Sequence, residues 1–354
     1  MLSRHFTRLW KEATFHLNNK TRRILAITIL FMIIAFMWVK SSGYQVYTMT
    51  RDIDPLASAP RLEAVNKPWA QNKVEFLKLK DVLRSSLRQM IAIVQVSKDV
   101  NLIRRCHETH QCQGVSPLRH YGTCALVGSS GILLNSRCGD EIDASDFVIR
   151  FNLSPQSGYT KDVGEKSSMM VLNTVMSGWV EGSINGAGVA RPRKDSKIET
   201  ANNTILFIPK SRSTTYYLQH SRSLEQTLRK QGINVIVAMG VPTAELTRDE
   251  RRRQIWEVLD KDHNDEDMPS TGLLLVEIAI TLCDRVRLYG FYPFARDQQD
   301  HVVPYHYWDN FTSVESVLQK RKHPHNFAYE FELLRNLHNK GVIEHKIGPC
   351  NNNL

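Results

Sequence analysis

Two histidines in the last quarter of the chain have the residue type and the surroundings for acid–base chemistry. His306 begins the segment HYWD, and His325 begins the segment HNFAYE. His325 directly precedes a stretch of helical periodicity, 326–339, which Gly341 ends. The positive end of a helix disfavours the imidazolium form, whereas Glu330 would favour it. We therefore interpret His325 as a candidate neutral base, and the alternative for each histidine is a purely structural role.

Two glycine-containing segments have the pattern of anion-binding turns. Gly128-Ser-Ser-Gly131 follows the apolar run 124–127, and Ser270-Thr271-Gly272 opens the apolar helix expected at 273–282. Backbone N–H groups and a helix dipole at such turns attract phosphate, although a serine there can simply cap its helix. Asp265-Glu-Asp267 resembles the D-x-D pattern of divalent-metal sites. Because it lies within a polar run, we interpret it as a solvated loop.

Short β-type runs alternate with helical stretches between these segments. The helical stretches are 221–231 and 249–259, and the runs are 124–127, 147–150, 169–172, 205–208, 235–238 and 286–289. This alternation predicts an α/β fold with a mostly parallel sheet and helices on both faces. Before the first run, apolar residues recur at helical spacing from 73 to 104, which predicts one long amphipathic helix.

The N-terminal region has the organisation of a membrane anchor. Residues 24–39 are apolar and uncharged, and six of the seven basic residues in 1–40 precede them. The positive-inside rule then predicts a cytosolic tail at 1–23, a transmembrane anchor at 24–39, a stem at 40–72 and a lumenal catalytic domain at 73–354. The alternative is a cleaved signal peptide.

Cysteines and charge agree with a lumenal domain. All six cysteines follow the proposed anchor, where disulfides are permitted, and none forms a C-x-x-C pair typical of zinc sites. Asn202 and Asn310 lie in glycosylation sequons, as does Asn152. The net charge is +10, most of it in residues 1–40. The mildly basic remainder suits a small anionic substrate and does not favour nucleic acid.

Four segments together resemble the motifs of the animal sialyltransferases, most closely those of the α-2,8 branch. In chain order they are CALVGSSGILLNSRCGDEIDASDFVIRFNLSP (124–155), STGLLLVEIAITLCDRVRLYGFYPF (270–294), HYWD (306–309) and HNFAYE (325–330). The resemblance covers about residues 118–350. It implies a Rossmann-like, GT-A-like domain that transfers sialic acid from CMP-sialic acid with inversion and needs no metal or other cofactor.

The resemblance also implies roles for individual residues. His325 would be the general base, with Glu330 in support. Asn173 is a supporting candidate at the donor site, on its position alone. The donor contacts would be Gly128, Ser129, Asn152, Ser270, Thr271, Gly272, Tyr292 and His306. A donor contact at Asn152 would leave its sequon unused. The family's disulfides imply the pairs Cys124–Cys283 and Cys138–Cys350, and elimination leaves Cys106–Cys112.

The partners and the location follow from the same resemblance. They are CMP-sialic acid, a sialylated glycolipid or glycoprotein acceptor, and the Golgi membrane through a single type II span, with homo-oligomers as an open possibility. Three positions depart from the α-2,8 branch: Ser129 stands where asparagine is usual, Tyr292 where tryptophan is usual, and Trp308 where tyrosine is usual. Ser129 motivates an alternative, a catalytically weak relative that binds glycans or pairs with Golgi enzymes. A further alternative is an enzyme of α-2,6 or α-2,3 linkage.

Overall fold

The structure is a computed structural model, and it describes residues 68–96, 115–184, 198–209, 224–242, 248–259, 267–314 and 325–350. The expected anchor at 24–39, the cysteines Cys106 and Cys112 and most of the D-x-D loop lie outside these ranges. Within the ranges described, every helix is too short or too polar to span a bilayer.

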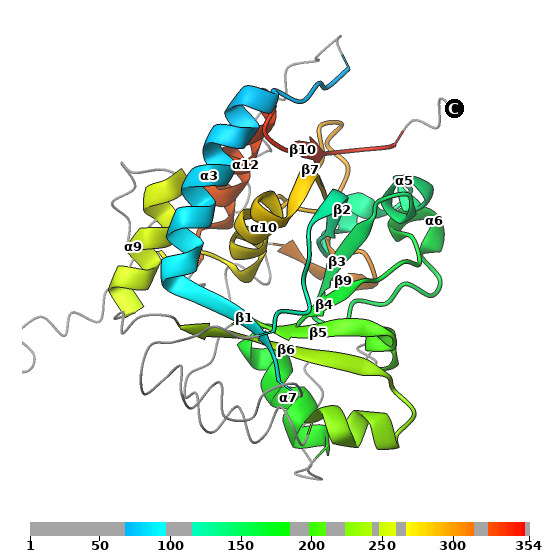
Figure 1. The fold of residues 1–354 in the computed structure, drawn as a ribbon. Helices are drawn as coiled ribbons and strands as arrows, with labels where there is room; N and C mark the ends of the chain where they lie inside the picture. Colours follow the sequence, from blue (N-terminus) through cyan, green and yellow to red (C-terminus); the bar gives the residue numbers. More distant parts are fainter. Residues whose placement is uncertain are drawn as a thin grey trace, which may run out of the picture. The chain divides into compact units, whose positions relative to one another are not determined.

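The described residues form a mixed α/β fold around one eight-stranded sheet (Figure 1). The strand order is β1-β6-β5-β4-β3-β2-β7-β10, and all neighbours are parallel except β1 and β6. The bounds are β1 Ile91–Gln95, β2 Tyr121–Val127, β3 Phe147–Phe151, β4 Met169–Val171, β5 Thr204–Ile208, β6 Val235–Pro242, β7 Cys283–Tyr289 and β10 Glu344–Lys346. The six predicted strands and the mostly parallel sheet are confirmed, whereas the edge strands β1 and β10 were missed.

The single long helix expected from 73 to 104 is wrong. Helix α3 covers Lys73–Met90, and Ile91 after it is extended, with φ −147° and ψ 130°. Residues 91–95 then pair with β6 as an antiparallel edge strand. The segment Ile91-Ala-Ile-Val94 is rich in β-branched residues, which favour a pleated strand over a helix. Helical spacing of apolar residues continued by chance across this boundary.

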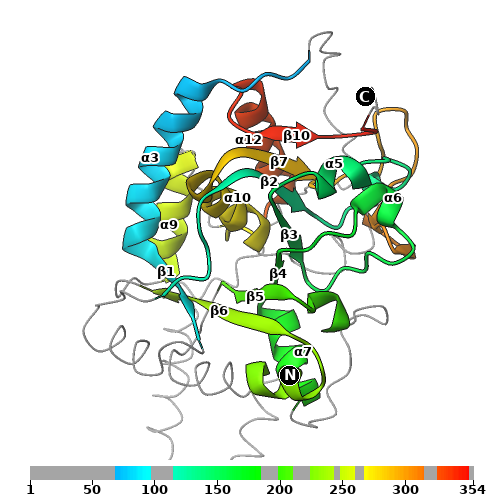
Figure 2. The ribbon, with the colours of Figure 1, turned by 45° about the vertical axis from the view of Figure 1, so that its right-hand side comes forward.

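Helices cover both faces of the sheet (Figures 1 and 2), as the sequence predicts. On one face α3, α9 (Arg248–Leu259), α10 (Thr271–Leu282) and α12 (Phe327–Asn339) share a core with Leu126 and Ile149. On the other face the neighbouring strand residues Ala125 and Val148 pack with α5 (Gly139–Asp143) and α6 (Thr160–Val163). Helix α7 (Thr174–Ile184) and residues 224–230 cover β4, β5 and β6 on that side. The two faces follow from the alternation of side chains along each strand.

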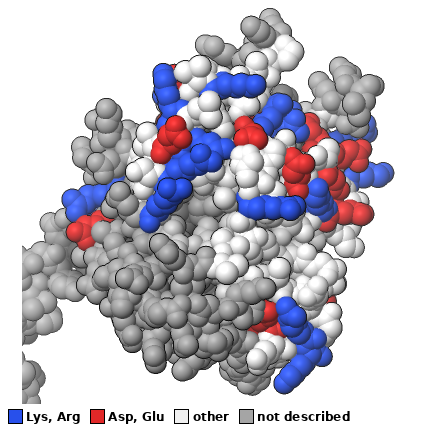
Figure 3. All heavy atoms as spheres, in the orientation of Figure 1, with Lys and Arg blue, Asp and Glu red and all other residues white. Residues whose placement is uncertain are grey.

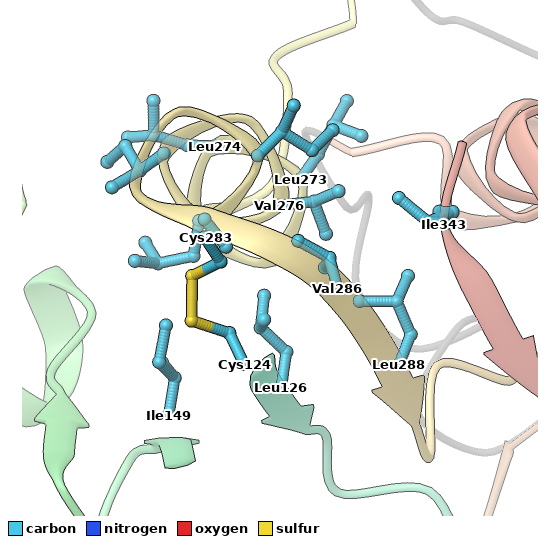
Figure 4. Packing of buried hydrophobic residues seen from close by; sticks show 14 of the residues in the cluster. Cys124, Leu126, Ile149, Leu273, Leu274, Val276, Cys283, Val286, Leu288 and Ile343 are labelled. Carbon is cyan, nitrogen blue, oxygen red and sulfur yellow. A yellow bond between two sulfur atoms is a disulfide. The ribbon is translucent and has the colours of Figure 1, made fainter. Parts of the chain in front are cut away.

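Helix α10 is buried along most of its length because its sequence is apolar on all sides except at Glu277. Residues 273–280 are all buried, and Figure 4 shows Leu273 and Val276 above the strand residues Val286 and Leu288. Cys283, directly after α10, forms a disulfide with Cys124 of β2. A second disulfide joins Cys138 to Cys350. Both pairs are those that the resemblance implies.

The contacts of the domain begin a few residues before Lys73. The indole N–H of Trp69 donates to the carbonyl of His338 at 3.0 Å, and the N–H of Asn72 donates to the carbonyl of Gly341 at 2.9 Å. On the outward side of α3, Lys78 pairs with Glu75. Figure 3 shows basic and acidic side chains interspersed on this face. The packed domain therefore includes residues assigned above to the end of the stem.

Candidate active site

The order of the strands reverses between β2 and β7. From β2 the chain builds β3, β4, β5 and β6 outward on one side, and then β7 and β10 on the other. In open α/β sheets, ligands bind at the carboxyl ends of the two strands that flank such a reversal. Here those strands end at Val127 and Tyr289, which are paired across the sheet. The topology therefore points to the turns that follow, Gly128–Gly131 and Gly290–Tyr292.

These two turns touch through their backbones. The N–H of Gly128 donates to the carbonyl of Tyr289 at 2.7 Å, and the N–H of Ser130 donates to the carbonyl of Gly290 at 3.3 Å. A Cβ atom at Gly128 would lie 2.4 Å from the Gly290 oxygen, and Gly290 has a φ of +69°. Only glycine fits such an approach and such a backbone. The predicted glycine turn is thus one half of a two-turn site.

Phe291 joins the start of α10 to this pair of turns. A Cβ at Gly272 would be 3.1 Å from the Cε1 atom of Phe291, and a Cβ at Gly128 would be 3.3 Å from its Cδ2 atom. The ring of Phe291 therefore lies between the two segments predicted to bind the nucleotide. It also meets Phe151, at the end of β3, edge-on with 6.0 Å between centroids. Sequence reasoning included Phe291 in a motif but gave it no role.

Ser270 caps α10 and is held by a carboxylate. Its Oγ accepts from the N–H of Leu273 at 3.0 Å, and the expected cap is confirmed. Its own N–H and O–H both donate to Glu330 of α12, at 2.6 Å each. Glu330 is buried. Glu330 therefore fixes the N-terminal turn of α10, which also contains Thr271 and Gly272, against the helix that follows His325.

A hydrogen bond decides which of the two ring nitrogens of His325 carries the proton. Its Nδ1 atom lies 2.6 Å from the carbonyl oxygen of Met268, two residues before Ser270. A carbonyl only accepts, so Nδ1 carries the proton, and in the neutral ring the lone pair is on Nε2. The side chain is partly buried. Met268 acts through its backbone, so no residue type in the sequence could have indicated it.

The HYWD segment is the turn of a hairpin, β8 (Pro304–His306) with β9 (Asp309–Ser313). The N–H of Tyr307 donates to the carbonyl of Ser129 at 3.0 Å, and its O–H donates to the carbonyl of Pro155 at 2.7 Å. The ring of His306 is buried and stacks on Trp308, with centroids 4.6 Å apart. The hairpin thus lies against the turn that follows β2, through the residue next to His306.

A buried positive charge lies beneath this hairpin. Arg150 of β3, opposite Val127, is fully buried and donates to the carbonyls of Lys166 and Val163 at 3.0 and 2.7 Å. Burial lowers the pKa of Arg150 to about 10, which still leaves it charged near neutral pH. Burial likewise raises the pKa of Tyr307 to about 12, although Arg150 opposes this. The electrostatic interaction with Tyr307 links this buried charge to the hairpin.

Asn152 and Asn173 lie together at the carboxyl ends of β3 and β4. The Oδ1 atom of Asn152 accepts from the N–H of Asn173 at 2.9 Å, and the Oδ1 of Asn173 accepts from the N–H of Met176 in α7 at 2.9 Å. Asn152 has a φ of +55°, which asparagine tolerates better than most residues. Because this oxygen is occupied, the side-chain amide nitrogen of Asn152 is the hydrogen-bond donor that the residue offers to a ligand.

Tyr292 follows Phe291 but faces a different environment. Its ring is 5% exposed and packs edge-on against Phe294 and Phe331. Its O–H donates to the carbonyl of Arg296 at 2.7 Å, and burial raises its pKa to about 12. The ring therefore packs into an apolar cluster that supports the turn, and the donor contact at Tyr292 stays a prediction.

The two predicted glycosylation sites lie in other parts of the chain. Asn202 is exposed, and its Oδ1 accepts from the N–H of Asn234 at 2.8 Å. Asn310 is in β9, and its side chain is outside what the structure describes. The predicted donor contacts and His325 belong to the turns, caps and hairpin at the carboxyl end of the sheet, where the ring of Tyr292 packs into an apolar cluster.

Comparison with known proteins shows the family to which the chain belongs. Residues 71–342 match the sequence profile of glycosyltransferase family 29, the sialyltransferases. The chain belongs to this family. It is 30% identical over 228 residues to the alpha-N-acetylneuraminide alpha-2,8-sialyltransferase of Xenopus laevis, which is 64% of this chain and 58% of that relative. The chain thus matches a little over half the length of this relative.

Two solved structures also align with this member of family 29. One is a mammalian sialyltransferase, with a TM-score of 0.41 and 19% identity over 82% of this chain and 90% of the other. The second is a mammalian sialyltransferase in complex with Gal-beta-1-3GalNAc-ortho-nitrophenol, with a TM-score of 0.42 and 22% identity over 81% of this chain and 93% of the other. The family assignment rests on the sequence profile.

Proposed function

We propose that this protein transfers sialic acid from CMP-sialic acid to a hydroxyl of a sialylated glycan and forms an α-2,8 linkage. Family membership supports the reaction class, and the relative from Xenopus laevis supports the linkage. The observation that carries the proposal is the meeting of Gly128, Gly272 and Phe291 beside the Ser270 cap, with His325 held close by. These groups suit an anionic nucleotide next to a base.

In the proposed mechanism, Nε2 of His325 takes the proton of the acceptor hydroxyl. The acceptor oxygen forms a bond to the anomeric carbon of sialic acid as the bond from that carbon to the phosphate oxygen breaks, and CMP leaves with the electron pair. Attack from the opposite face inverts the anomeric centre. The Met268 carbonyl stabilises the imidazolium through its hydrogen bond to Nδ1–H. The negative charge of the leaving group would be stabilised by the N-terminal end of α10, by His306 and by the buried charge of Arg150.

The test is an assay of the full chain with CMP-sialic acid and a mixed panel of sialylated glycans, read by mass spectrometry with linkage analysis. His325→Ala should lower kcat by at least about a hundredfold, because general-base catalysis contributes about 10²–10⁴ in rate. His301, whose side chain is 75% exposed, provides the matched control in His301→Ala. Equal turnover by both variants would remove His325 from the mechanism. Products with α-2,6 or α-2,3 bonds would refute the linkage.

A second candidate function is a weakly active relative that binds glycans or Golgi enzymes. It is favoured by Ser129, where the α-2,8 branch usually has asparagine. Ser129 contributes its backbone carbonyl to Tyr307, and its hydroxyl is shorter than an asparagine amide. Ser129→Asn should then tighten CMP binding and raise turnover. Strong activity of the unchanged protein, with no gain in Ser129→Asn, would exclude this alternative.

The proposed setting is the Golgi lumen, with a single type II span at 24–39. The acceptor would be a sialylated glycolipid or glycoprotein, extended by one or a few residues, because the sequence has no strongly basic stretch of the kind expected for polysialylation. Protease protection of the chain in sealed Golgi vesicles tests the topology. Digestion of the catalytic domain without detergent would contradict it.

A further inference from the structure

His345 is a buried histidine that the proposed mechanism does not use. It is the central residue of β10, at the edge of the sheet beside β7, and is 2% exposed. Its Nε2 atom lies 2.9 Å from the carbonyl oxygen of Phe291. Because a carbonyl only accepts, Nε2 carries a proton and donates it. The His345 side chain therefore holds the backbone of the turn that follows β7.

The surroundings of His345 hold the ring in place and keep it neutral. Its backbone N–H donates to Nδ1 of His338, its carbonyl accepts from Arg335, and its ring meets the edge of Phe331 at 5.4 Å. All three partners belong to α12. Burial and the nearby Arg335 lower the pKa of His345 to about 3. The ring is thus an uncharged donor throughout the pH range of a cell.

The hydrogen bond to Phe291 is the polar contact that explains a histidine at this position. Among the described residues, Nδ1 of His345 is buried without a hydrogen-bond partner. An apolar side chain would fill the same space without that unpaired nitrogen. Compared with an apolar side chain, the imidazole has one advantage here, the hydrogen bond that its Nε2–H donates to the Phe291 carbonyl.

Phe291 is the residue whose ring lies between Gly128 and Gly272. These two segments enclose the ring of Phe291, and His345 holds its backbone carbonyl. We propose that His345 is a positioning residue for the nucleotide site, acting through the Phe291 carbonyl to hold that ring between the two turns. This inference rests on the function proposed above. It adds a residue that lies outside all four motifs.

The experiment compares His345→Leu, which loses the donor, with His345→Gln, whose amide can replace Nε2–H. CMP affinity of the full chain is measured by calorimetry, and amide hydrogen exchange is followed over residues 286–294. We expect His345→Leu to weaken CMP binding about tenfold, or about 1.4 kcal/mol, and His345→Gln to recover most of this loss. Exchange over 286–294 should rise in His345→Leu alone. His120→Leu, beside Asp284 at the other end of β7, is the matched control.

Each outcome bears on the inference. Unchanged CMP affinity in folded His345→Leu would overturn it, as would equal losses in His345→Leu and His345→Gln, because packing alone would then explain the effect. His345→Phe, which keeps a flat ring but has no donor, replaces His345→Leu if that variant does not fold. If the unchanged protein does not bind CMP, the proposed function fails. Altered exchange in His345→Leu alone would then still support the positioning of the turn.

Discussion

The buried carboxyl group of Glu277 should make the stability of this protein fall as pH rises. Glu277 lies in the interior of α10 and is 1% exposed. Its pKa is raised well above the usual 4.5, first by burial and then by the nearby charge of Glu330. Glu277→Gln replaces the neutral acid with an uncharged group of the same shape. We therefore expect this variant to be more stable than the unchanged protein at neutral pH.

The magnitude follows from proton linkage. Above pH 4.5 the unfolded chain releases the proton of Glu277 while the folded chain keeps it. The free energy of unfolding then falls by up to about 1.4 kcal/mol per pH unit, until the pH passes the folded-state pKa. At pH 6.5 this is a ceiling of about 3 kcal/mol. The variant should thus match the unchanged protein near pH 4 and exceed it increasingly above pH 5.

The assay is urea unfolding of both proteins between pH 4 and 8, with intact disulfides. Glu344→Gln is a control of opposite sign, since Lys346 and Arg285 lower the pKa of Glu344 despite its burial. A lowered pKa contributes stability above pH 4.5 that is lost as pH falls through the folded-state value. Glu344→Gln should therefore show a constant deficit above pH 4.5. A difference between Glu277→Gln and the unchanged protein that does not grow with pH would refute the reasoning.

Three further substitutions test the geometry of the site and its supports. Glu330→Ala removes both acceptors at the start of α10, and should cost about 2–4 kcal/mol in urea unfolding and weaken CMP binding; wild-type stability would contradict the buried contact. Gly128→Ala places a methyl group against the turn after β7, and should cost about 1–3 kcal/mol. Its control is Gly178→Ala, in an open position of α7, which should stabilise the protein by about 0.5–1 kcal/mol. Equal melting temperatures in Gly128→Ala and Gly178→Ala would rule out the close approach of Gly128 to Gly290. Cys350→Ser opens a disulfide that joins residues 212 apart, and should cost about 2–5 kcal/mol; the same melting temperature in Cys350→Ser and the unchanged protein would show that this bond is unimportant.

Local patterns in the sequence determined much of the fold and of the candidate site. The six β-type runs became strands because short, mostly apolar runs of this kind are typical of strands in a parallel sheet covered on both faces. Helix α10 was predictable from its apolar residues and from Ser270 at its start. His306, His325 and the glycine turns could be singled out because their residue types and spacing carry chemical information.

Tertiary structure decided how these segments meet. Local periodicity does not specify which strand pairs with which, so only the fold could bring the ends of β2 and β7 together. For the same reason, local periodicity did not predict that α3 ends at Met90, because Ile91 is extended through its pairing with β6.

The proton on His325 and the position of Phe291 were also beyond the sequence. Each depends on a backbone carbonyl, of Met268 in one case and of Phe291 itself in the other. Every residue has such a carbonyl, so its direction comes from the folded chain and no residue type indicates it. Residue types thus indicated which chemistry is available, and the folded backbone decided where each group acts.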